Sequence, residues 1–443
     1  MKRTLIITTS FPPQGGGGVV RSSRLAKYLP DYGWGPVILT TRPPRSESSE
    51  GNFPLKAIPP VYRAPRMDLP ELYKSLKKLF GNLQISRQKA GIKHPKPHLN
   101  NEGYQHRRRK AEYFFIPDPS VLWIPGALLF GVVSMIRNRP QVVFSTSPDP
   151  SAHLVALLLS TITGKPWVAE FRDPWMTNPF RRPKPFRWQE ALEAKLERLV
   201  LFRADRIVVT SAQFKDDFLE RYPSLRQENI HFVPNGFDPE DFEEVQPKAF
   251  DKVTIVHAGN FYNDRSSANF LTALSLLLNW DGNLRSQIQV IFVGGLDPKG
   301  QSLISEYGLE DVVIQKGVVS HSESISYVCS ADVLLLVPGP GRGTMTGKIF
   351  EYLAAKKPIF ALADEGPARD LVLETGTGVV SPAEDTAAIA RQLEGLLRTV
   401  MTEDGYPFQD VSQVMLRYDR RHIAGEIAEI LDFVSGFDKI GQG

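Results

Sequence analysis

Short apolar runs rich in Val and Ile alternate with segments of helical periodicity in two successive series along this chain. The first series comprises the runs at 5–9, 37–41, 142–146, 167–171, 207–209 and 230–233. The second comprises the runs at 254–257, 290–293, 312–315, 333–337, 359–362 and 378–380. Such alternation is typical of a parallel β-sheet with helices on both faces. Because 443 residues exceed what one hydrophobic core usually supports, we predict two α/β domains.

A turn-rich, acidic segment at 234–244 separates the two series and places the domain boundary near residue 240. We therefore expect an N-terminal domain at 1–240, a C-terminal domain at 241–410, and a helical tail at 411–443 that packs back on the N-terminal domain. Both domains are expected to be doubly wound and Rossmann-like, and to face each other across a cleft.

Composition narrows the class of protein. The formal net charge of +4 is small for this length and does not indicate a nucleic-acid partner. The single cysteine, Cys329, excludes an intrachain disulfide and a Cys-based zinc site, and it fits a reducing cytosol. The apolar part of residues 1–9 is too short for a signal peptide, so we expect a first β-strand there and a cytoplasmic protein.

Between about 43 and 112 the alternation gives way to Pro, Ser and basic residues. Within this stretch, leucines at helical spacing in 69–83 form an apolar stripe, and Lys74, Lys77 and Lys78 lie off it. A basic amphipathic helix suits an anionic membrane surface, which raises the hypothesis of peripheral binding to the inner face of the cell membrane. A helix packed on its own domain, with solvated lysines, is the alternative.

The segment 339–360 (GPGRGTMTGKIFEYLAAKKPIF) is a Gly-rich turn between an apolar strand and a helix. Glycine amides and a helix N-terminus attract anions. Lys348 could meet a phosphate oxygen, and Glu351, one turn later, could accept hydrogen bonds from two ribose hydroxyls. Diphosphate beside ribose describes a sugar nucleotide. The alternative is an ordinary strand–helix connection in which Lys348 and Glu351 form a solvated pair.

Two further segments follow predicted strands, where open α/β sheets bind ligands. The glycine loop at 15–18 lacks the dinucleotide-binding fingerprint, and no acidic residue ends the second strand, so NAD is not expected. Arg172 and Asp173 follow the strand at 167–171. Asp173 could act as a base or orient an acceptor, and Arg172 could steer an acidic one; a local salt bridge between them is the alternative.

In their order and spacing, these segments resemble the retaining family 4 glycosyltransferases, which have the two-domain GT-B fold. The matching segments are FPPQGGGGVVRSSRLAKYL, PNGFDPEDF, HAGNFYNDR, FVGG and SADVLLLVPGPGRGTMTGKIFEYLAAKKPI. PDPSVLWIPGA, STSPDPSAHL and VAEFRDPW resemble a subset found among bacterial surface-polysaccharide and exopolysaccharide enzymes. The resemblance covers nearly the whole chain except 43–112. It implies an N-terminal acceptor domain and a C-terminal nucleotide-sugar donor domain.

The resemblance also implies roles for individual positions. Arg265 and Lys348 match the cations that meet the donor diphosphate, and Glu351 matches the glutamate that grips the ribose. His153 lies where a family histidine approaches the transferred sugar, although a purely structural histidine is the alternative. Further donor-binding positions implied by the match are Gly16, Gly17, Gly18, Gly259, Asn260, Gly294, Thr344, Thr346 and Gly347. His153, Arg172 and Asp173 are the predicted catalytic residues.

One position departs from the family pattern. The family's first glutamate, eight positions before Glu351, would fall at 343, where this chain has Gly343. That glutamate contacts the donor sugar, so its absence puts in doubt which sugar is bound and, less strongly, whether the protein turns over.

The predicted function is therefore a retaining, hexosyltransferase-type enzyme. It would move a sugar from a nucleotide-sugar to a hydroxyl of a glycan or lipid-linked acceptor in surface polysaccharide biosynthesis. No cofactor is expected besides the nucleotide-sugar co-substrate, and no metal is required if Lys348 and Arg265 neutralise the leaving diphosphate. Two alternatives stay open: a GT-B-fold sugar-nucleotide epimerase, and a non-catalytic glycosyltransferase-like subunit.

Overall fold

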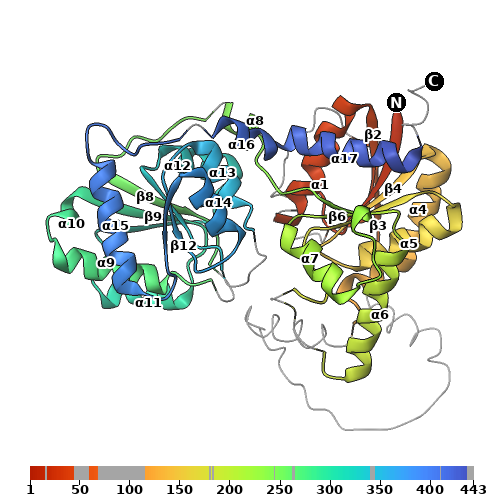
Figure 1. The fold of residues 1–443 in the computed structure, drawn as a ribbon, viewed down its shortest axis with the longest axis horizontal. Coiled ribbons are helices and arrows are strands. Elements are labelled where there is room, and N and C mark those ends of the chain that lie inside the picture. The colour runs from red at the N-terminus through yellow and green to blue at the C-terminus, as the bar shows by residue number, and fades with distance from the viewer. Residues whose placement is uncertain are drawn as a thin grey trace, which may run out of the picture. The chain divides into compact units, whose positions relative to one another are not determined.

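The computed structural model describes residues 1–14, 17–43, 59–67, 115–178, 181, 184–243, 245–261, 265–339, 345–409 and 411–436. The contacts divide the chain into two compact units (Figure 1). Unit 1 comprises Met1–Val209, Phe218–His231 and Ile427–Gly443. Unit 2 comprises Thr210–Asp217 and Phe232–Glu426. The prediction of two α/β domains is thus confirmed.

Within the described residues, unit 1 is built on a seven-stranded sheet with the order β3-β2-β1-β4-β5-β6-β7. The strands are β1 (Lys2–Ile7), β2 (Trp34–Thr41), β3 (Val61–Ala64), β4 (Val142–Thr146), β5 (Trp167–Phe171), β6 (Arg206–Val209) and β7 (Ile230–Phe232). The pairs from β3 through to β6 are parallel. Every residue of β4 and β5 is buried, as expected for parallel strands covered on both faces.

The principal helices of unit 1 connect these strands. They are α1 (Gly17–Tyr28), α4 (Ile124–Asn138), α5 (Ser151–Thr163), α6 (Arg187–Arg203) and α7 (Ala212–Arg221), the last of which is shared with unit 2. Short 3-10 turns add η1 (Leu29–Tyr32), η3 (Pro119–Trp123) and η4 (Gln227–Asn229). The helix α4 packs on β2 and β3, and α5 packs on β4 and β5. Both α4 and α5 end at a residue in the left-handed conformation, which stops the helix.

Unit 2 has a parallel sheet of six described strands in the order β10-β9-β8-β11-β12-β13. They are β8 (Val253–Ala258), β9 (Ile288–Val293), β10 (Val313–Gly317), β11 (Val333–Leu336), β12 (Ile359–Leu362) and β13 (Gly378–Ser381). Its helices are α8 (Glu240–Glu243), α9 (Ala268–Trp280), α10 (Leu284–Gln287), α11 (Pro298–Glu306), α12 (His321–Ser330), α13 (Lys348–Ala355), α14 (Pro367–Thr375), α15 (Thr386–Val400) and α16 (Ser412–Arg417).

Alternate residues of the unit 2 strands pack in two separate hydrophobic cores, one on each face of the sheet. On β11, Leu335 packs in one cluster with α9 and α15, while Leu334 and Leu336 pack in the other with α12, α13 and α14. This period of two is what a strand buried on both faces requires. It fixes the register of β11, and β11 leads into the segment that carries Lys348.

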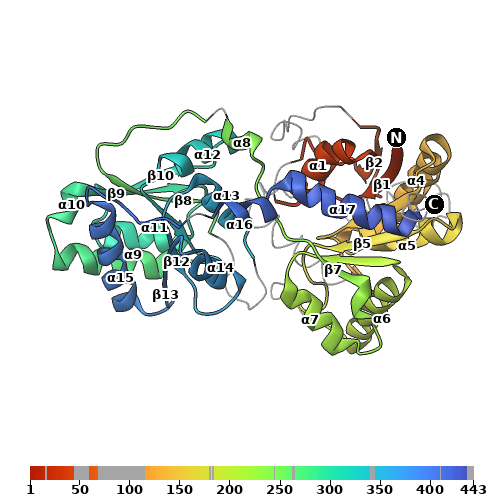
Figure 2. The same ribbon diagram turned by 45° about the horizontal axis from the view of Figure 1, so that its top comes forward.

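The last helix, α17 (Arg420–Ser435), begins in unit 2 and ends in unit 1 (Figure 2). Its Asp432 carboxylate accepts a hydrogen bond from Trp34 Nε1 at 2.9 Å and is paired with the Lys2 ammonium. The final helix therefore contacts the first two strands of unit 1.

Two features of the basic stretch at 43–112 can be compared with the sequence-based expectations. Residues 61–64 form the strand β3, which the sequence pattern did not indicate because the segment VYRA is only partly buried and too short to show alternation. The predicted helix at 69–83 lies outside the described residues. Outside this stretch, η3 and α4 together (Pro119–Asn138) are the one described helical segment long and apolar enough to cross a membrane by length and composition alone.

Candidate functional site

The carboxyl ends of β8, β9 and β11 meet at one edge of the unit 2 sheet, because these strands are adjacent and parallel. Gly259 follows β8, and its N–H donates to Val293 O at 2.6 Å. Gly294 follows β9, and its N–H donates to Gly317 O at 2.7 Å. The Asn260 side-chain oxygen accepts a hydrogen bond from Gly295 N at 2.6 Å, which ties the two loops together.

Lys348, the first residue of α13, crosses the backbone at Gly259. A Cβ atom at position 259 would lie 2.1 Å from Lys348 Cε and 2.2 Å from its Nζ, and the φ of Gly259 is +147°. A Cβ at Gly294, where φ is +122°, would lie 2.3 Å from the Gly259 carbonyl oxygen. Only glycine fits at these two positions without displacing Lys348 or the neighbouring loop.

Arg265 has the same relation to a third glycine. Gly339, beyond β11, has a φ of +85°, and a Cβ there would lie 2.8 Å from Arg265 Cγ and Nε. Two cations thus lie over glycines at one sheet edge, near enough that the Arg265 charge affects the ionisation of Lys348. Burial, with a further contribution from Arg265, lowers the pKa of the Lys348 ammonium, and Glu351 opposes this shift.

Glu351 lies one turn along α13 from Lys348 and is partly exposed. Among the residues that the structure describes, its carboxylate forms no hydrogen bond or ion pair, and it does not pair with Lys348. The arrangement therefore differs from the solvated pair considered above, because Lys348 folds over Gly259 and leaves Glu351 available to a ligand.

The other predicted donor-site residues have the following places. Thr346 is buried, and its carbonyl accepts from Ile349 N at 3.3 Å at the start of α13. Gly347 is exposed and caps the same helix. Gly18 lies in α1 of unit 1, where a Cβ would be 3.3 Å from an Arg172 nitrogen. Gly17 is the first residue of α1, whereas Gly16, Thr344 and Gly343 lie outside the described residues.

His257 and Tyr352 support the site and were not singled out from sequence. His257 Nδ1 donates to Leu335 O at 2.9 Å, and its ring stacks on Phe261 at 4.3 Å between centroids. The Tyr352 hydroxyl accepts from Ala258 N at 2.9 Å and donates to Leu335 O at 3.3 Å, which fastens α13 to β8 and β11. Burial raises the pKa of Tyr352, so the phenol stays protonated and can donate.

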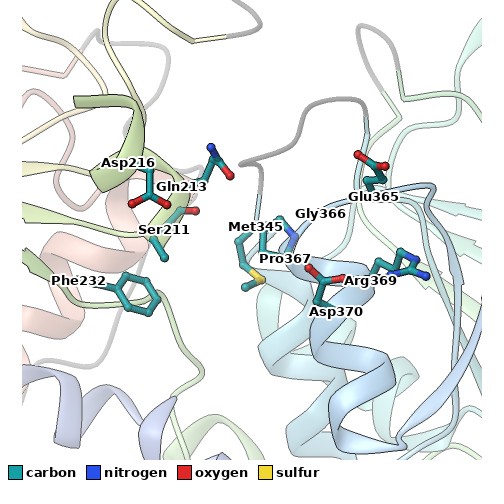
Figure 3. Close-up of a pocket in the computed structure, with 11 residues that line it drawn as sticks. Ser211, Gln213, Asp216, Phe232, Met345, Glu365, Gly366, Pro367, Arg369 and Asp370 are labelled. Carbon is teal, nitrogen blue, oxygen red and sulfur yellow. Dashed lines mark hydrogen bonds and ion pairs between the residues drawn. The ribbon is translucent and has the colours of Figure 1, made fainter. Parts of the chain in front are cut away.

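A hollow of unit 2 opens beside the start of α14. Met345, Glu365, Gly366, Pro367, Arg369 and Asp370 are among its lining residues (Figure 3). Gly366 has a φ of +124° and precedes Pro367, the first residue of α14, a common arrangement at a helix N-terminus. Apart from Met345, which lies in the segment 339–360, these residues belong to no motif that the sequence indicated.

In unit 1, His153 is fully buried in α5. Its Nδ1 lies 2.8 Å from Ser145 Oγ, that hydroxyl accepts from Trp167 Nε1 at 2.8 Å, and the imidazole packs on Phe171 at 4.6 Å. These contacts are those of the structural alternative, and contact between His153 and a sugar stays a prediction.

Arg172 and Asp173 form the local ion pair that was the alternative to a catalytic role, at 3.0 Å between Nη2 and Oδ2. Both side chains keep some exposure, and Arg172 N donates to Ser147 Oγ at 2.9 Å. The pair therefore lies at the carboxyl ends of β4 and β5, where a ligand can reach it.

The sequence did not indicate a buried ion pair that lies two residues before Arg172 on β5. Arg21 of α1 contacts Glu170 of β5 at 2.7 Å, and Thr146 Oγ1 of β4 donates to the same carboxylate at 2.6 Å. Both charged side chains are almost completely buried. The pair joins the glycine-loop helix to two neighbouring strand ends.

Acid is expected to destabilise both units through their buried histidines. Burial lowers the pKa of His153 to about 3, and burial with the charge of Lys348 does the same for His257. Below about pH 6.5 the unfolded chain binds protons that the folded protein excludes, so stability falls as the pH drops from 6.5 towards 3. The loss is about 1.4 kcal/mol per pH unit for each histidine.

Urea unfolding of His153→Asn and His257→Asn at pH 7 and pH 5 measures this effect. Each variant should lose less stability between the two pH values than the parent chain, by about 2 kcal/mol. Burial and the nearby Asp149 raise the pKa of Asp118 to about 7, so protonation of Asp118 stabilises the folded protein as the pH falls. This contribution is the same in the parent and in the variants, and it cancels when they are compared. His422→Asn, at an exposed ring, is the control. A parent-like pH dependence in both variants would contradict the assignment.

Comparison with known proteins agrees with this geometry. Two α/β units, each built on a parallel sheet, are the architecture of the GT-B class of fold. Residues 16–236 match the family described as Glycosyl transferase 4-like domain, and residues 252–399 match Glycosyl transferases group 1. The chain therefore belongs to the glycosyltransferases of this two-domain type.

Individual relatives are distant. The chain is 25% identical over 141 residues to alpha-maltose-1-phosphate synthase of Mycolicibacterium smegmatis, a match that spans 31% of this chain and 36% of that protein. Sucrose-phosphate synthase from Thermosynechococcus elongatus is 15% identical, with a TM-score of 0.66 over 98% of this chain and 99% of that one. Anabaena Alr3699/HepE in complex with UDP is 15% identical, with a TM-score of 0.63 over 98% and 100%. These structures confirm the GT-B fold.

Proposed function

We propose that this glycosyltransferase is a retaining hexosyltransferase that uses a nucleotide-sugar. The acceptor is a hydroxyl of a glycan or lipid-linked molecule in bacterial surface polysaccharide biosynthesis. The observation that carries the proposal is the placement of Lys348 and Arg265 over glycines at one sheet edge, with Glu351 one turn away on α13.

Each group has chemistry suited to one part of the donor. Lys348 and Arg265 supply positive charge for a diphosphate, and the unshielded amides of Gly259 and its neighbours allow close approach. The Glu351 carboxylate can accept from both ribose hydroxyls. Alr3699/HepE was solved with UDP and with UDP-glucose, which makes a uracil nucleotide the first donor to test here.

In the proposed reaction the bond between the anomeric carbon and the diphosphate oxygen breaks, and a bond from that carbon to the acceptor oxygen forms on the same face. The acceptor proton passes to the leaving phosphate. Negative charge develops on the diphosphate, where Lys348 and Arg265 stabilise it, and such preorganised stabilisation usually contributes most to the rate enhancement of an enzyme. These two cations are proposed to suffice without a metal ion.

Unit 1 is proposed to bind the acceptor. Arg172 keeps a partly exposed guanidinium that suits an acidic or pyrophosphate-linked acceptor, and Asp173 can orient its hydroxyl. An acceptor carried by lipid would place the enzyme at the inner face of the cell membrane, as a peripheral protein of the cytoplasm.

Calorimetric titration with UDP tests the donor site. Lys348→Met and Glu351→Gln should each weaken UDP binding roughly 10- to 100-fold, the range for losing a hydrogen bond to a charged group. The matched controls are Lys316→Met and Glu374→Gln, two exposed residues of unit 2 outside the site. Parent-like affinity in both site variants would contradict the assignment.

Turnover is tested separately with a panel of nucleotide-sugars. Sugar transfer or slow hydrolysis with release of the nucleoside diphosphate supports the transferase. Conversion of the nucleotide-sugar to an isomer without any acceptor would instead indicate an epimerase. Binding without turnover of any donor would leave only the non-catalytic subunit.

A further inference from the structure

The outer face of α6 carries apolar and basic side chains together. Trp188, Leu192, Leu199 and Phe202 recur along one side of the helix and are all exposed, Trp188 by 61%. The exposed charged residues of the same face are Arg187, Lys195, Arg198 and Arg203. Trp188 stacks with the exposed Phe186 just before the helix, and the Arg198 guanidinium lies over the Phe202 ring.

All three glutamates of α6 lie on its other side and are paired within unit 1. Glu190 and Glu193 are bound by Arg181, at 2.6 and 2.7 Å. Glu197 is bound by Arg221 at 2.7 Å and accepts from the Tyr222 hydroxyl at 2.7 Å. Glu193 and Glu197 are thus buried, and Glu190 is partly exposed but paired with Arg181, so the outward face of the helix is positive as well as apolar.

Two neighbouring helices extend this face. The helix α5 lies between α4 and α6, as Figures 1 and 2 show, and it packs on both. Leu129 and Ile136 of α4, and Leu158 and Ile162 of α5, are exposed, and neither helix contains an acidic residue. We call the exposed residues of these helices the α4–α6 surface. The α4–α6 surface does not extend onto α7, because α7 exposes the acidic residues Asp216 and Glu220.

We propose that the α4–α6 surface docks on an anionic lipid bilayer. Apolar side chains, with Trp and Phe among them, enter the boundary between headgroups and acyl chains, while Lys and Arg meet lipid phosphates. Charge complementarity selects this occupant, because every exposed charged residue on these three helices is basic among the residues that the structure describes. This surface is formed by other residues than those of the predicted helix at 69–83, and the proposal does not depend on the donor site.

Cosedimentation of the full chain with vesicles tests the proposal. We expect binding to phosphatidylcholine vesicles that contain phosphatidylglycerol, and much weaker binding to phosphatidylcholine alone. Lys195→Gln with Arg198→Gln should weaken binding about fivefold for each cation removed. Trp188→Ser with Leu192→Ser should weaken it at least about tenfold.

The matched control is Trp280→Ser with Leu373→Ser, which removes two comparably exposed apolar side chains from unit 2. It should bind vesicles as the parent does. Only variants whose unfolding temperature matches that of the parent chain are compared. Substitutions at exposed positions are expected to leave this temperature unchanged.

Three results would overturn the proposal. The parent chain could fail to bind vesicles that contain phosphatidylglycerol. The two α6 variants could bind them as tightly as the parent, which would leave binding to another part of the chain. Sedimentation could show a dimer that the α6 variants dissociate while vesicle binding is unchanged, which would assign the surface to a second copy of the chain.

Discussion

Replacing Glu170 with alanine is expected to lower the free energy of unfolding by about 3–5 kcal/mol, because it removes a buried carboxylate that contacts the buried Arg21 guanidinium. The Arg21 and Glu170 side chains are only 5% and 1% exposed and lie 2.7 Å apart. The same change removes the acceptor of the Thr146 hydroxyl. Urea unfolding followed in the parent and the variant measures the loss.

Two further variants separate the charge from the packing. Glu228→Ala breaks an exposed pair with Arg226 and should change stability by no more than about 0.5 kcal/mol. Arg21→Met combined with Glu170→Leu removes both charges and should recover much of the loss, since a buried pair can often be replaced by apolar side chains. A single variant as stable as the parent would show that the buried pair is not needed.

Gly259→Ala is expected to abolish most donor binding. The new Cβ would overlap the Lys348 side chain, which must leave its place, so the diphosphate loses this cation as it does in Lys348→Met, roughly 10- to 100-fold. In addition, alanine at a φ of +147° strains the backbone by about 1–3 kcal/mol.

Calorimetry with UDP and thermal unfolding measure the two effects separately. Gly282→Ala is the matched control, because a Cβ at that position meets nothing within 4 Å and the φ there is not positive. The combination Gly259→Ala with Lys348→Met should bind UDP no more weakly than Gly259→Ala alone, since both changes remove one cation from one place. Fully additive losses would refute this explanation.

Much of the fold could be predicted because its strands are buried on both faces. Runs such as 142–146 and 167–171 are short and mostly apolar, and they coincide with β4 and β5. The edge strand β3 could not be predicted in this way, because its four residues are mostly half-buried and follow no period.

The donor side of the site could be predicted in part, because Lys348 and Glu351 are one helical turn apart and their spacing alone puts them together. The glycines of the site have a second role that was not expected from the sequence. Gly339, in the Gly-rich turn, was expected to bring backbone amides near an anion, and Gly259 was expected to bind the donor. In the structure these two glycines also make room for Arg265 and Lys348. Contacts between distant segments, such as Arg21 with Glu170, leave no trace in the local pattern.

The contacts of Lys2 and Trp34 with Asp432 affect the order in which the two units can fold during translation. Unit 1 takes residues from both ends of the chain, whereas the main segment of unit 2, Phe232–Glu426, is continuous. On the ribosome, the first domain to be started is thus the last to be finished, because its closing helix emerges only after unit 2 has been translated. Until then the Trp34 indole and the Lys2 ammonium lack the Asp432 carboxylate that they share in the complete fold.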